Sequence, residues 1–123
     1  KLHQKLESAS VNRGFISLLH EQFDIALSDY DSAIKINQNY IEAYKKRATL
    51  YEENGQIQKA LSDRNKIIEL KPNDYFSYID RGLIYTNEKK FDQAISDYNK
   101  SIKLNSKLAD AYYCKAFTFY TRK

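Results

Sequence analysis

The sequence contains few of the residues that interrupt regular secondary structure. Its 123 residues include three glycines and a single proline. Because a β-rich fold needs a turn about every 8–12 residues, this shortage argues against such a fold. Methionine is absent and the chain starts at Lys1, so we expect it to be a piece of a longer protein.

Cysteine and one-sided charge are also scarce. One cysteine cannot form an internal disulfide, so we expect a reducing, cytoplasmic location. No apolar run approaches the ~20 residues that a membrane-spanning helix needs. The net charge of +4 is small, and the basic residues mostly alternate with acidic ones. Because nucleic-acid binders usually concentrate positive charge on one stripe, we do not expect nucleic-acid binding. Because a long apolar run is missing, we do not expect membrane insertion either.

Patterns typical of catalytic and metal sites are missing as well. The sequence has no nucleophile beside a base, no glycine-rich phosphate loop and no spaced pair of carboxylates. His3 and His20 have no second His or Cys nearby, whereas a metal site needs three or four ligands. Cys114 is better explained as a packed thiol than as a reactive one. We therefore expect no enzyme activity, no metal and no cofactor.

The chain does contain an internal repeat. The segment FDIALSDYDSAIKIN, from Phe23, matches FDQAISDYNKSIKLN, from Phe91, and a third copy, IQKALSDRNKIIELK, begins at Ile57. Because Ile57 lies midway between the other two starting points, the period is about 34 residues. A period of this length is typical of helical proteins in which each repeat stacks on the next.

The period predicts a single domain, 1–123, made of consecutive repeats. Its pieces are the tail of a preceding repeat (1–6), three whole repeats (7–40, 41–74 and 75–108) and the first helix of a truncated or capping repeat (109–123). Each repeat has apolar residues at helical spacing in two stretches, separated by a break such as Asn54-Gly55. Short connections force neighbouring helices to run antiparallel, so we predict a helical hairpin for every repeat. In the first repeat the inner turn falls near His20.

Two recurring patterns predict how the helices pack. Small residues recur on first helices (Gly14, Ala48, Gly82 and Ala116) and on second helices (Ala26, Ala60 and Ala94), where they let helix axes approach closely. Basic residues recur at one register of the first helix (Arg13, Arg47, Arg81 and Lys115), and aspartates at one register of the second (Asp29, Asp63 and Asp97). We predict that each arginine reaches an aspartate on an adjacent second helix, forming a ladder along the stack.

Together these features resemble the tetratricopeptide repeat. The resemblance runs through Tyr78, Gly82, Tyr85, Phe91, Ala94 and Tyr98 in the third repeat, and through Tyr44, Ala48, Tyr51, Gly55, Ala60 and Pro72 in the second. The sequence departs from the family pattern where Gln38 and Ser106 replace a proline and where Arg64 replaces an aromatic residue. The resemblance implies an all-α fold, a right-handed superhelical solenoid of antiparallel helix hairpins.

The resemblance also implies where a partner protein or peptide binds. First helices line a concave groove in this family, and second helices form the convex back. Mapped onto this sequence, the groove residues are Asn12, Phe15, Leu19, Lys45, Lys46, Thr49, Phe76, Ile79, Leu83, Tyr113 and Phe117. Exposed apolar patches often mark binding sites, although isolated apolar residues also pack between neighbouring helices, and solvation alone explains a lysine pair. We expect a protein–protein interaction scaffold.

One subtype of the family is not expected. Members that grip the C-terminal carboxylate of a chaperone use Lys and Asn on the first helix of one repeat, Asn on the next, and Lys with Arg on the third. Here those places hold Val11 and Phe15, then Lys46, then Phe76 and Asp80. The chain therefore does not build the clamp in this register, nor in the register one repeat later.

The alternative function is self-association. Residues 109–123 are predicted to be a first helix without its second helix, so Tyr112, Ala116 and Phe119 lose their usual cover. The exposed face could then pair with the same face of another copy, giving a homodimer through residues 109–123.

Overall fold

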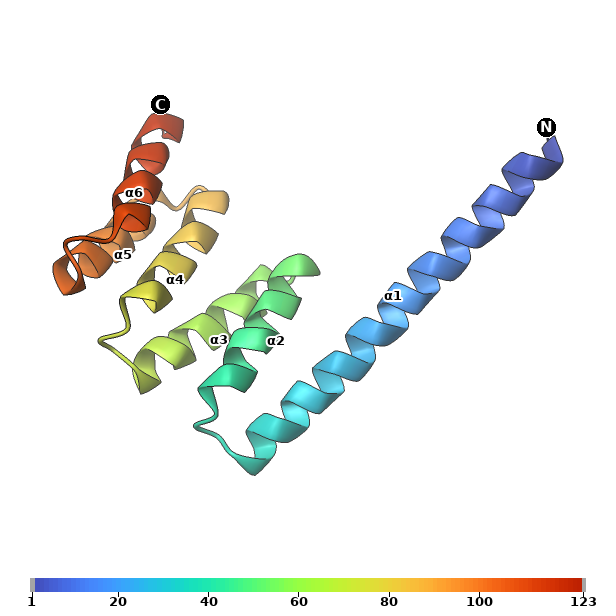
Figure 1. Ribbon diagram of the computed structural model, residues 1–123, viewed down its shortest axis with the longest axis horizontal. Coiled ribbons are helices and arrows are strands. Elements are labelled where there is room, and N and C mark those ends of the chain that lie inside the picture. The colour runs from blue at the N-terminus through green and yellow to red at the C-terminus, as the bar shows by residue number, and fades with distance from the viewer. Residues whose placement is uncertain (1, 123) are drawn as a thin grey trace. The chain divides into compact units, whose positions relative to one another are not determined.

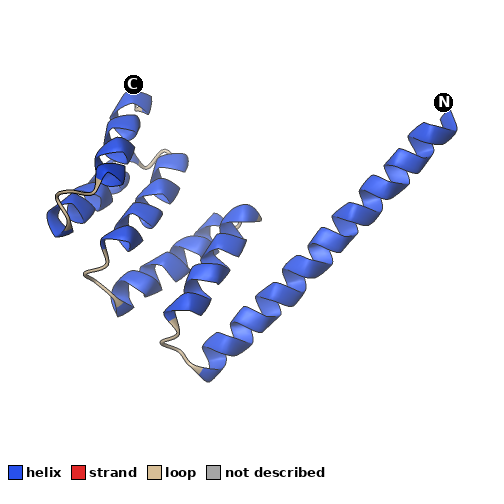
Figure 2. Cartoon of the chain, viewed as in Figure 1, coloured by secondary structure: helices blue, strands red, loops and turns tan. Residues whose placement is uncertain are grey.

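The computed structural model describes the backbone of residues 2–122 and the side chains of residues 18–122. All the regular secondary structure in that range is α-helical, in six helices (Figure 2). None of these helices is both long enough and apolar enough to cross a membrane. The chain divides into two compact parts, residues 1–38 and residues 39–123, which we call the N-terminal and C-terminal parts. The prediction of an all-α fold is confirmed.

The C-terminal part is a stack of two helical hairpins and a final helix (Figure 1). The first hairpin joins α2 to α3, and the second joins α4 to α5. In addition α3 packs against α4, while α6 packs against both α4 and α5, so successive hairpins form a solenoid. The helix bounds are Ile41–Glu53 (α2), Ile57–Leu70 (α3), Tyr75–Asn87 (α4), Phe91–Leu104 (α5) and Ala109–Thr121 (α6).

The inner turn of each hairpin uses one residue in the left-handed region. Gly55 has φ 74° and Lys89 has φ 61°, at equivalent positions of the repeat. The following amide donates a hydrogen bond back to the helix, from Gln56 N to Tyr51 O and from Lys90 N to Tyr85 O, each 2.8 Å long. This is a common way to end a helix, and glycine adopts it with the least strain.

The predicted hairpin for residues 7–40 is wrong. A single helix, α1, spans Leu2–Ile36 without interruption, including the expected turn near His20 and most of the predicted tail 1–6. Glu21 stands where the other turns have Gly55 and Lys89. A left-handed conformation costs a residue other than glycine about 1–2 kcal/mol; the packing of α4 against α5 offsets this cost at Lys89, whereas the continuous helix avoids it at Glu21. The division into repeats at residues 40, 74 and 108 stays a prediction.

Each hairpin of the C-terminal part closes around residues with little or no side chain. Ala48, Ala60 and Ala94 are completely buried, and Gly82 is packed against the ring of Tyr98. A methyl group added at Gly82 would lie 2.6 Å from Cε1 of that ring. The prediction that small residues let the helices approach closely is confirmed for these four positions.

Two rungs of the predicted arginine–aspartate ladder are present. Arg47 donates to both carboxylate oxygens of Asp63 at 2.9 and 2.6 Å, and Arg81 donates to Asp97 at 2.8 and 2.6 Å. The Arg81 guanidinium also donates to Asn65 Oδ1 at 3.0 Å, so it joins α3, α4 and α5. Tyrosine rings flank both cations, with guanidinium carbons 5.7–5.9 Å from the ring centroids. The side chain of Arg13 lies outside the described residues.

The loops between hairpins are fixed by a repeated tyrosine. Tyr78 donates its hydroxyl proton to the carbonyl oxygen of Pro72 at 2.7 Å, and Tyr112 donates to that of Ser106 at 3.1 Å. The replacement of the family's proline by Ser106 therefore keeps this contact, because the acceptor is a backbone carbonyl. Asp74 additionally caps α4 by accepting from Phe76 N.

Gly82→Ala is expected to destabilise the C-terminal part. Its methyl group would overlap a buried ring, which typically costs about 1–3 kcal/mol, and the better helix propensity of alanine returns only about 1 kcal/mol. Urea unfolding measures the change. In a Tyr98→Leu background the same substitution should become neutral or stabilising, because the ring is gone. A stabilising effect in the wild-type chain would contradict the close approach.

Arg81→Met is expected to lower the free energy of unfolding by about 3 kcal/mol, because it leaves the buried carboxylate of Asp97 without its cation. The matched control is Lys66→Met, which removes the partner of the exposed Glu69 and should change stability by no more than about 0.5 kcal/mol. If the two variants lose the same stability in urea, the ladder does not hold the hairpin together.

Candidate functional site

The predicted binding surface lies on the first helices of the C-terminal part. Its members on α2 are Lys45, Lys46 and Thr49; those on α4 are Phe76 and Leu83; those on α6 are Tyr113 and Phe117. All are exposed except Lys45, which is half-buried. We call these seven residues the first-helix face.

The first-helix face is apolar at its α4 and α6 end. The exposed fractions are 49% for Phe76, 43% for Leu83, 74% for Tyr113 and 52% for Phe117. Because α4 packs against α6, the four side chains come from adjacent helices. Large apolar side chains grouped on neighbouring helices are typical of a surface that another molecule covers.

Four predicted groove residues fall elsewhere or are not described. Ile79 is buried, with 6% exposure, and so belongs to the packed interior and not to a ligand surface. It lies on α4, which contacts three other helices of the C-terminal part. Leu19 is exposed but belongs to α1 in the N-terminal part. The side chains of Asn12 and Phe15 lie outside the described residues.

A buried arginine adjoins the α2 and α4 end of the face. Arg64, on α3, donates to Glu52 Oε2 at 3.0 and 2.7 Å and to Thr49 Oγ1 at 3.3 Å. Its Nη1 atom lies 3.6 Å from Asp80 Oδ2 on α4. One guanidinium thus bridges α2 and α4. The sequence showed that Arg64 replaces an aromatic residue, but it did not reveal these partners, which belong to other helices and are distant along the chain.

Asp80 is the least satisfied charge in this cluster. Burial raises its pKa above the ordinary value, and the nearby cations Arg64 and Lys45 oppose that effect only in part. Among the described residues it accepts no hydrogen bond, since Arg64 stays beyond hydrogen-bonding distance. Phe76 and Leu83 lie four residues before and three residues after it, so they share its side of α4. Its side chain is 43% exposed, so a hydrogen-bond donor of a ligand can reach it between these two apolar side chains.

The equivalent junction between α4 and α6 is uncharged. Tyr98, at the repeat position of Arg64, places its hydroxyl 2.9 Å from Thr86 Oγ1, which in turn lies 2.9 Å from Thr118 Oγ1. All three residues are buried, and burial raises the pKa of Tyr98. A neutral hydrogen-bonded triad therefore joins α4 to α6, whereas an arginine joins α2 to α4.

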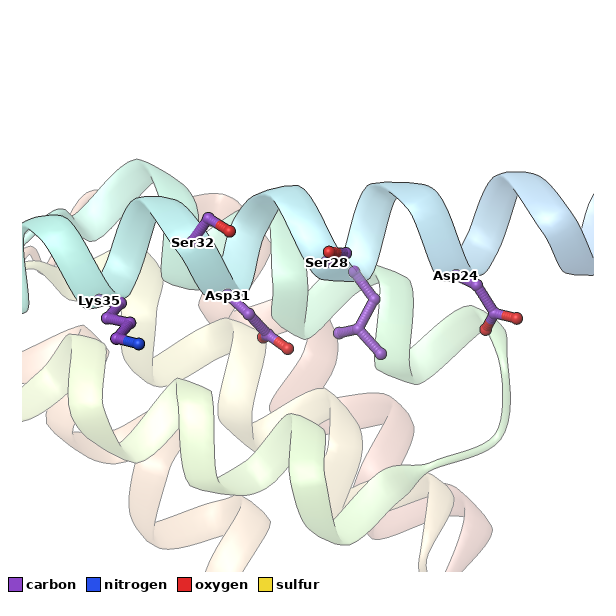
Figure 3. A pocket seen from close by; sticks show the side chains of 6 residues that line it. Asp24, Ser28, Asp31, Ser32 and Lys35 are labelled. Carbon is purple, nitrogen blue, oxygen red and sulfur yellow. The ribbon is translucent and has the colours of Figure 1, made fainter.

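Three other hollows of the described surface offer no comparable site. One lies along α1, and Figure 3 shows that its lining side chains come from that single helix: Asp24, Leu27, Ser28, Asp31, Ser32 and Lys35. Two others lie beside the Arg47–Asp63 and Arg81–Asp97 pairs, whose polar groups already bond to each other. In residues 18–122, no group of three His, Cys, Asp or Glu side chains could hold a metal ion. Burial raises the pKa of the lone thiol, Cys114, which favours its unreactive form.

Comparison with solved structures finds several similar chains. A tetratricopeptide repeat protein from Parabacteroides merdae ATCC 43184 has a TM-score of 0.78 and 30% identity over 90% of this chain and 43% of its own. MamA has a TM-score of 0.72 and 24% identity over 84% of this chain and 60% of its own. The first TPR of Spaghetti (RPAP3), bound to the HSP90 peptide SRMEEVD, has a TM-score of 0.72 and 19% identity over 89% of this chain and 87% of its own. The likenesses under 25% identity show the fold alone.

This chain spans less than two thirds of the first two structures. A comparison with curated proteins finds no significant match. Two family models do match, one described as tetratricopeptide repeat over residues 29–62 and one described as TPR repeat over residues 82–122. Given these matches, the repeat period and the stacked hairpins, the chain belongs to the tetratricopeptide repeat family.

Proposed function

We propose that this chain is a non-catalytic scaffold that binds a segment of a partner protein along the first-helix face. The observation that carries the proposal is the group of exposed apolar side chains on α4 and α6, next to the charged cluster around Arg64. The apolar side chains supply affinity by losing contact with water, and the fixed charges orient the bound segment.

The rigidity of the site supports binding without large rearrangement. Thr86, Tyr98 and Thr118 lock α4 to α6 beneath the apolar end. Arg64 fixes Glu52 and Thr49 beneath the charged end. A surface that is ordered before the ligand arrives loses less conformational entropy on binding.

The partner segment we propose is not a C-terminal chaperone tail. The first TPR of Spaghetti (RPAP3) is bound to an HSP90 peptide, but its likeness to this chain is at 19% identity. Here Asp80 occupies one of the places where a clamp would need a cation. A carboxylate brought there would meet a second carboxylate, which disfavours binding.

A segment with a hydrogen-bond donor between two apolar residues fits the face better. Its donor, a lysine, arginine or amide group, would meet Asp80, and its apolar side chains would cover Phe76 and Leu83. A charged donor would form a charge-assisted hydrogen bond with the exposed carboxylate of Asp80, so this bond and the apolar contacts favour the same ligand.

Phe76→Glu combined with Phe117→Glu is expected to abolish capture of the partner, because both substitutions place a charge in the apolar end of the face. The matched control is Asn99→Glu, at an exposed position of α5 on the second-helix side. A photo-crosslinking residue at position 83 or 99, followed by mass spectrometry, measures which proteins touch each side.

The proposal requires crosslinks that form from position 83, disappear in the double variant and persist in the control. Crosslinks of equal yield from positions 83 and 99, or capture that survives the double substitution, would place the binding surface elsewhere. Circular dichroism verifies that the variants keep their helices.

Asp80→Asn is expected to stabilise the free chain slightly at neutral pH. Because the folded chain raises the pKa of Asp80, ionisation opposes folding: the associated stability is present below the unfolded pKa and is lost as pH rises through the folded pKa. The amide lacks this penalty, so the difference between variant and wild type should disappear below about pH 3.8. Urea midpoints at pH 7 and pH 3 measure it, with the exposed Asp110→Asn as the control. A variant that is less stable at pH 7 would show that Arg64 outweighs burial.

A second candidate function is self-association through residues 109–123. Tyr112 and Phe119, on a different side of α6 from Tyr113 and Phe117, are 47% and 45% exposed, and Ala116 between them is exposed too. Pairing of this face with the same face of another copy would bury these side chains. Phe119→Glu would then return a homodimer to monomers in light scattering, without affecting capture of the partner.

A further inference from the structure

The last helix, α6, carries a cation between two aromatic residues. The corresponding cations of α2 and α4 are Arg47 and Arg81, each flanked by two tyrosine rings and each paired with an aspartate of the following helix. In α6 the cation is Lys115, and the aromatic residues are Tyr112 and Phe119, three residues before it and four residues after it. Residues at these intervals share one side of a helix, so α6 has one half of the same contact.

The aromatic residues of α6 are more exposed than their counterparts in the hairpins. Within the described residues of the C-terminal part, α6 packs against α4 and α5, and its buried residues are Ala111 and Thr118. Tyr112 is 47% exposed and Phe119 is 45% exposed, whereas Tyr78, at the repeat position of Tyr112, is only 7% exposed. This side of α6 therefore has room for a further helix.

The charge on this side of α6 has one sign. Lys115 and Arg122 lie about two turns apart along the same side as Phe119, while Asp110, the acidic residue of α6, lies about 180° away around the helix. The Arg122 guanidinium covers the Phe119 ring and lies 3.3 Å from the exposed Asp92, but no ion pair among residues 18–122 includes Lys115. We call the residues on this side the α6 face: Tyr112, Lys115, Ala116, Phe119 and Arg122.

We propose that the α6 face binds an acidic amphipathic helix of a partner protein. An aspartate of that helix pairs with Lys115 between the two rings, as Asp63 pairs with Arg47 and Asp97 pairs with Arg81. Charge favours this occupant over a second copy, because two α6 faces would bring like charges together. The proposal is independent of binding on the first-helix face, which shares no residue with the α6 face.

The helices α3 and α5 indicate what the partner helix carries. Each has an alanine three residues before its aspartate, Ala60 before Asp63 and Ala94 before Asp97, and both alanines are completely buried. Residues three apart lie on the same side of a helix. A partner helix with a small residue and an aspartate at this spacing can therefore approach α6 closely enough for the carboxylate to reach the lysine.

Ala116 restricts the residue that follows the aspartate. In the second hairpin that residue is Tyr98, and a methyl group added to Gly82 would lie 2.6 Å from its ring. In the first hairpin it is Arg64, and there the small residue of the first helix is Ala48. Because α6 has alanine at this position, the face favours a long flexible side chain after the aspartate over an aromatic ring.

Residues 23–36 of this chain fit the α6 face less well than a helix like α3. They contain the alanine and the aspartate, Ala26 and Asp29, but Tyr30 follows the aspartate. A tyrosine at this position would meet the methyl group of Ala116, as it would meet one added to the equivalent glycine of α4.

The test uses a dye-labelled, end-capped peptide with the sequence of residues 57–70, added to the whole chain and followed by fluorescence anisotropy. Lys115→Glu in the chain and Asp63→Lys in the peptide should each weaken binding at least about tenfold, because each brings like charges together. Combining the two changed molecules should restore binding. The matched control is Lys100→Glu, the same charge change at an exposed position of α5, which should bind like the wild type.

A second peptide tests the role of Ala116. The peptide of residues 91–104, in which Tyr98 follows the aspartate, should bind the wild-type chain more weakly than the peptide of residues 57–70. Ala116→Gly should strengthen the binding of residues 91–104, because it removes the methyl group that meets the ring. Tighter binding of residues 91–104 to the wild-type chain would contradict this restriction.

Several results would overturn the proposal. The peptide of residues 57–70 does not bind the wild-type chain, or binds Lys115→Glu equally well, or the charge-exchanged pair fails to bind: each excludes the contact at Lys115. A homodimer that Phe119→Glu dissociates and the peptide does not would make a second copy the occupant of the α6 face. Circular dichroism verifies that each variant keeps its helices, so lost binding is distinguished from lost folding.

Discussion

An arginine on the first helix and an aspartate on the second join each hairpin of the C-terminal part, beside a residue with almost no side chain. The small residue, Ala48 or Gly82, lets the two helices approach until the guanidinium reaches both carboxylate oxygens. Removing two charges from water is costly, so such a pair is stable only with good geometry and further hydrogen bonds. Asn65 and the flanking tyrosine rings supply these further contacts around Arg81. Because these contacts occupy the hairpin interior, the other side of the first helices stays exposed.

One interior position of the repeat differs where the exposed side of the first helices changes from charged to apolar. Arg64 and Tyr98 occupy the same place in successive repeats, and each joins the first helices on either side of it. Arg64 lies beside Glu52 and Asp80, because a buried cation requires anionic partners. The tyrosine needs only neutral hydroxyl groups, and the neighbouring exposed residues there are apolar. The difference between Arg64 and Tyr98 at this interior position therefore accompanies a first-helix face that is charged at its α2 end and apolar at its α4 and α6 end.

The N-terminal part shows how a local backbone preference and a tertiary contact compete. Glu21 and Lys89 stand at the same turn position, and neither is a glycine. Lys89 nevertheless adopts a positive φ, since the packing of α4 against α5 offsets the local cost. At Glu21 the helix continues instead of turning.

The features that recur in every repeat could be predicted from the sequence alone. Helices begin at Ile41, Tyr75 and Ala109, one repeat period apart, and the two described arginine–aspartate pairs follow the predicted register, because periodicity and charge are properties of each repeat. Features that depend on several repeats at once became visible only in the folded chain. Ile79 is buried, although Tyr113 at the same repeat position is exposed. Arg64 has ion-pair partners on two different helices. The helix α1 is continuous through Glu21. The choice between a turn and a helix there depends on how much packing the chain would gain by folding back, and the residues of the turn do not encode that gain.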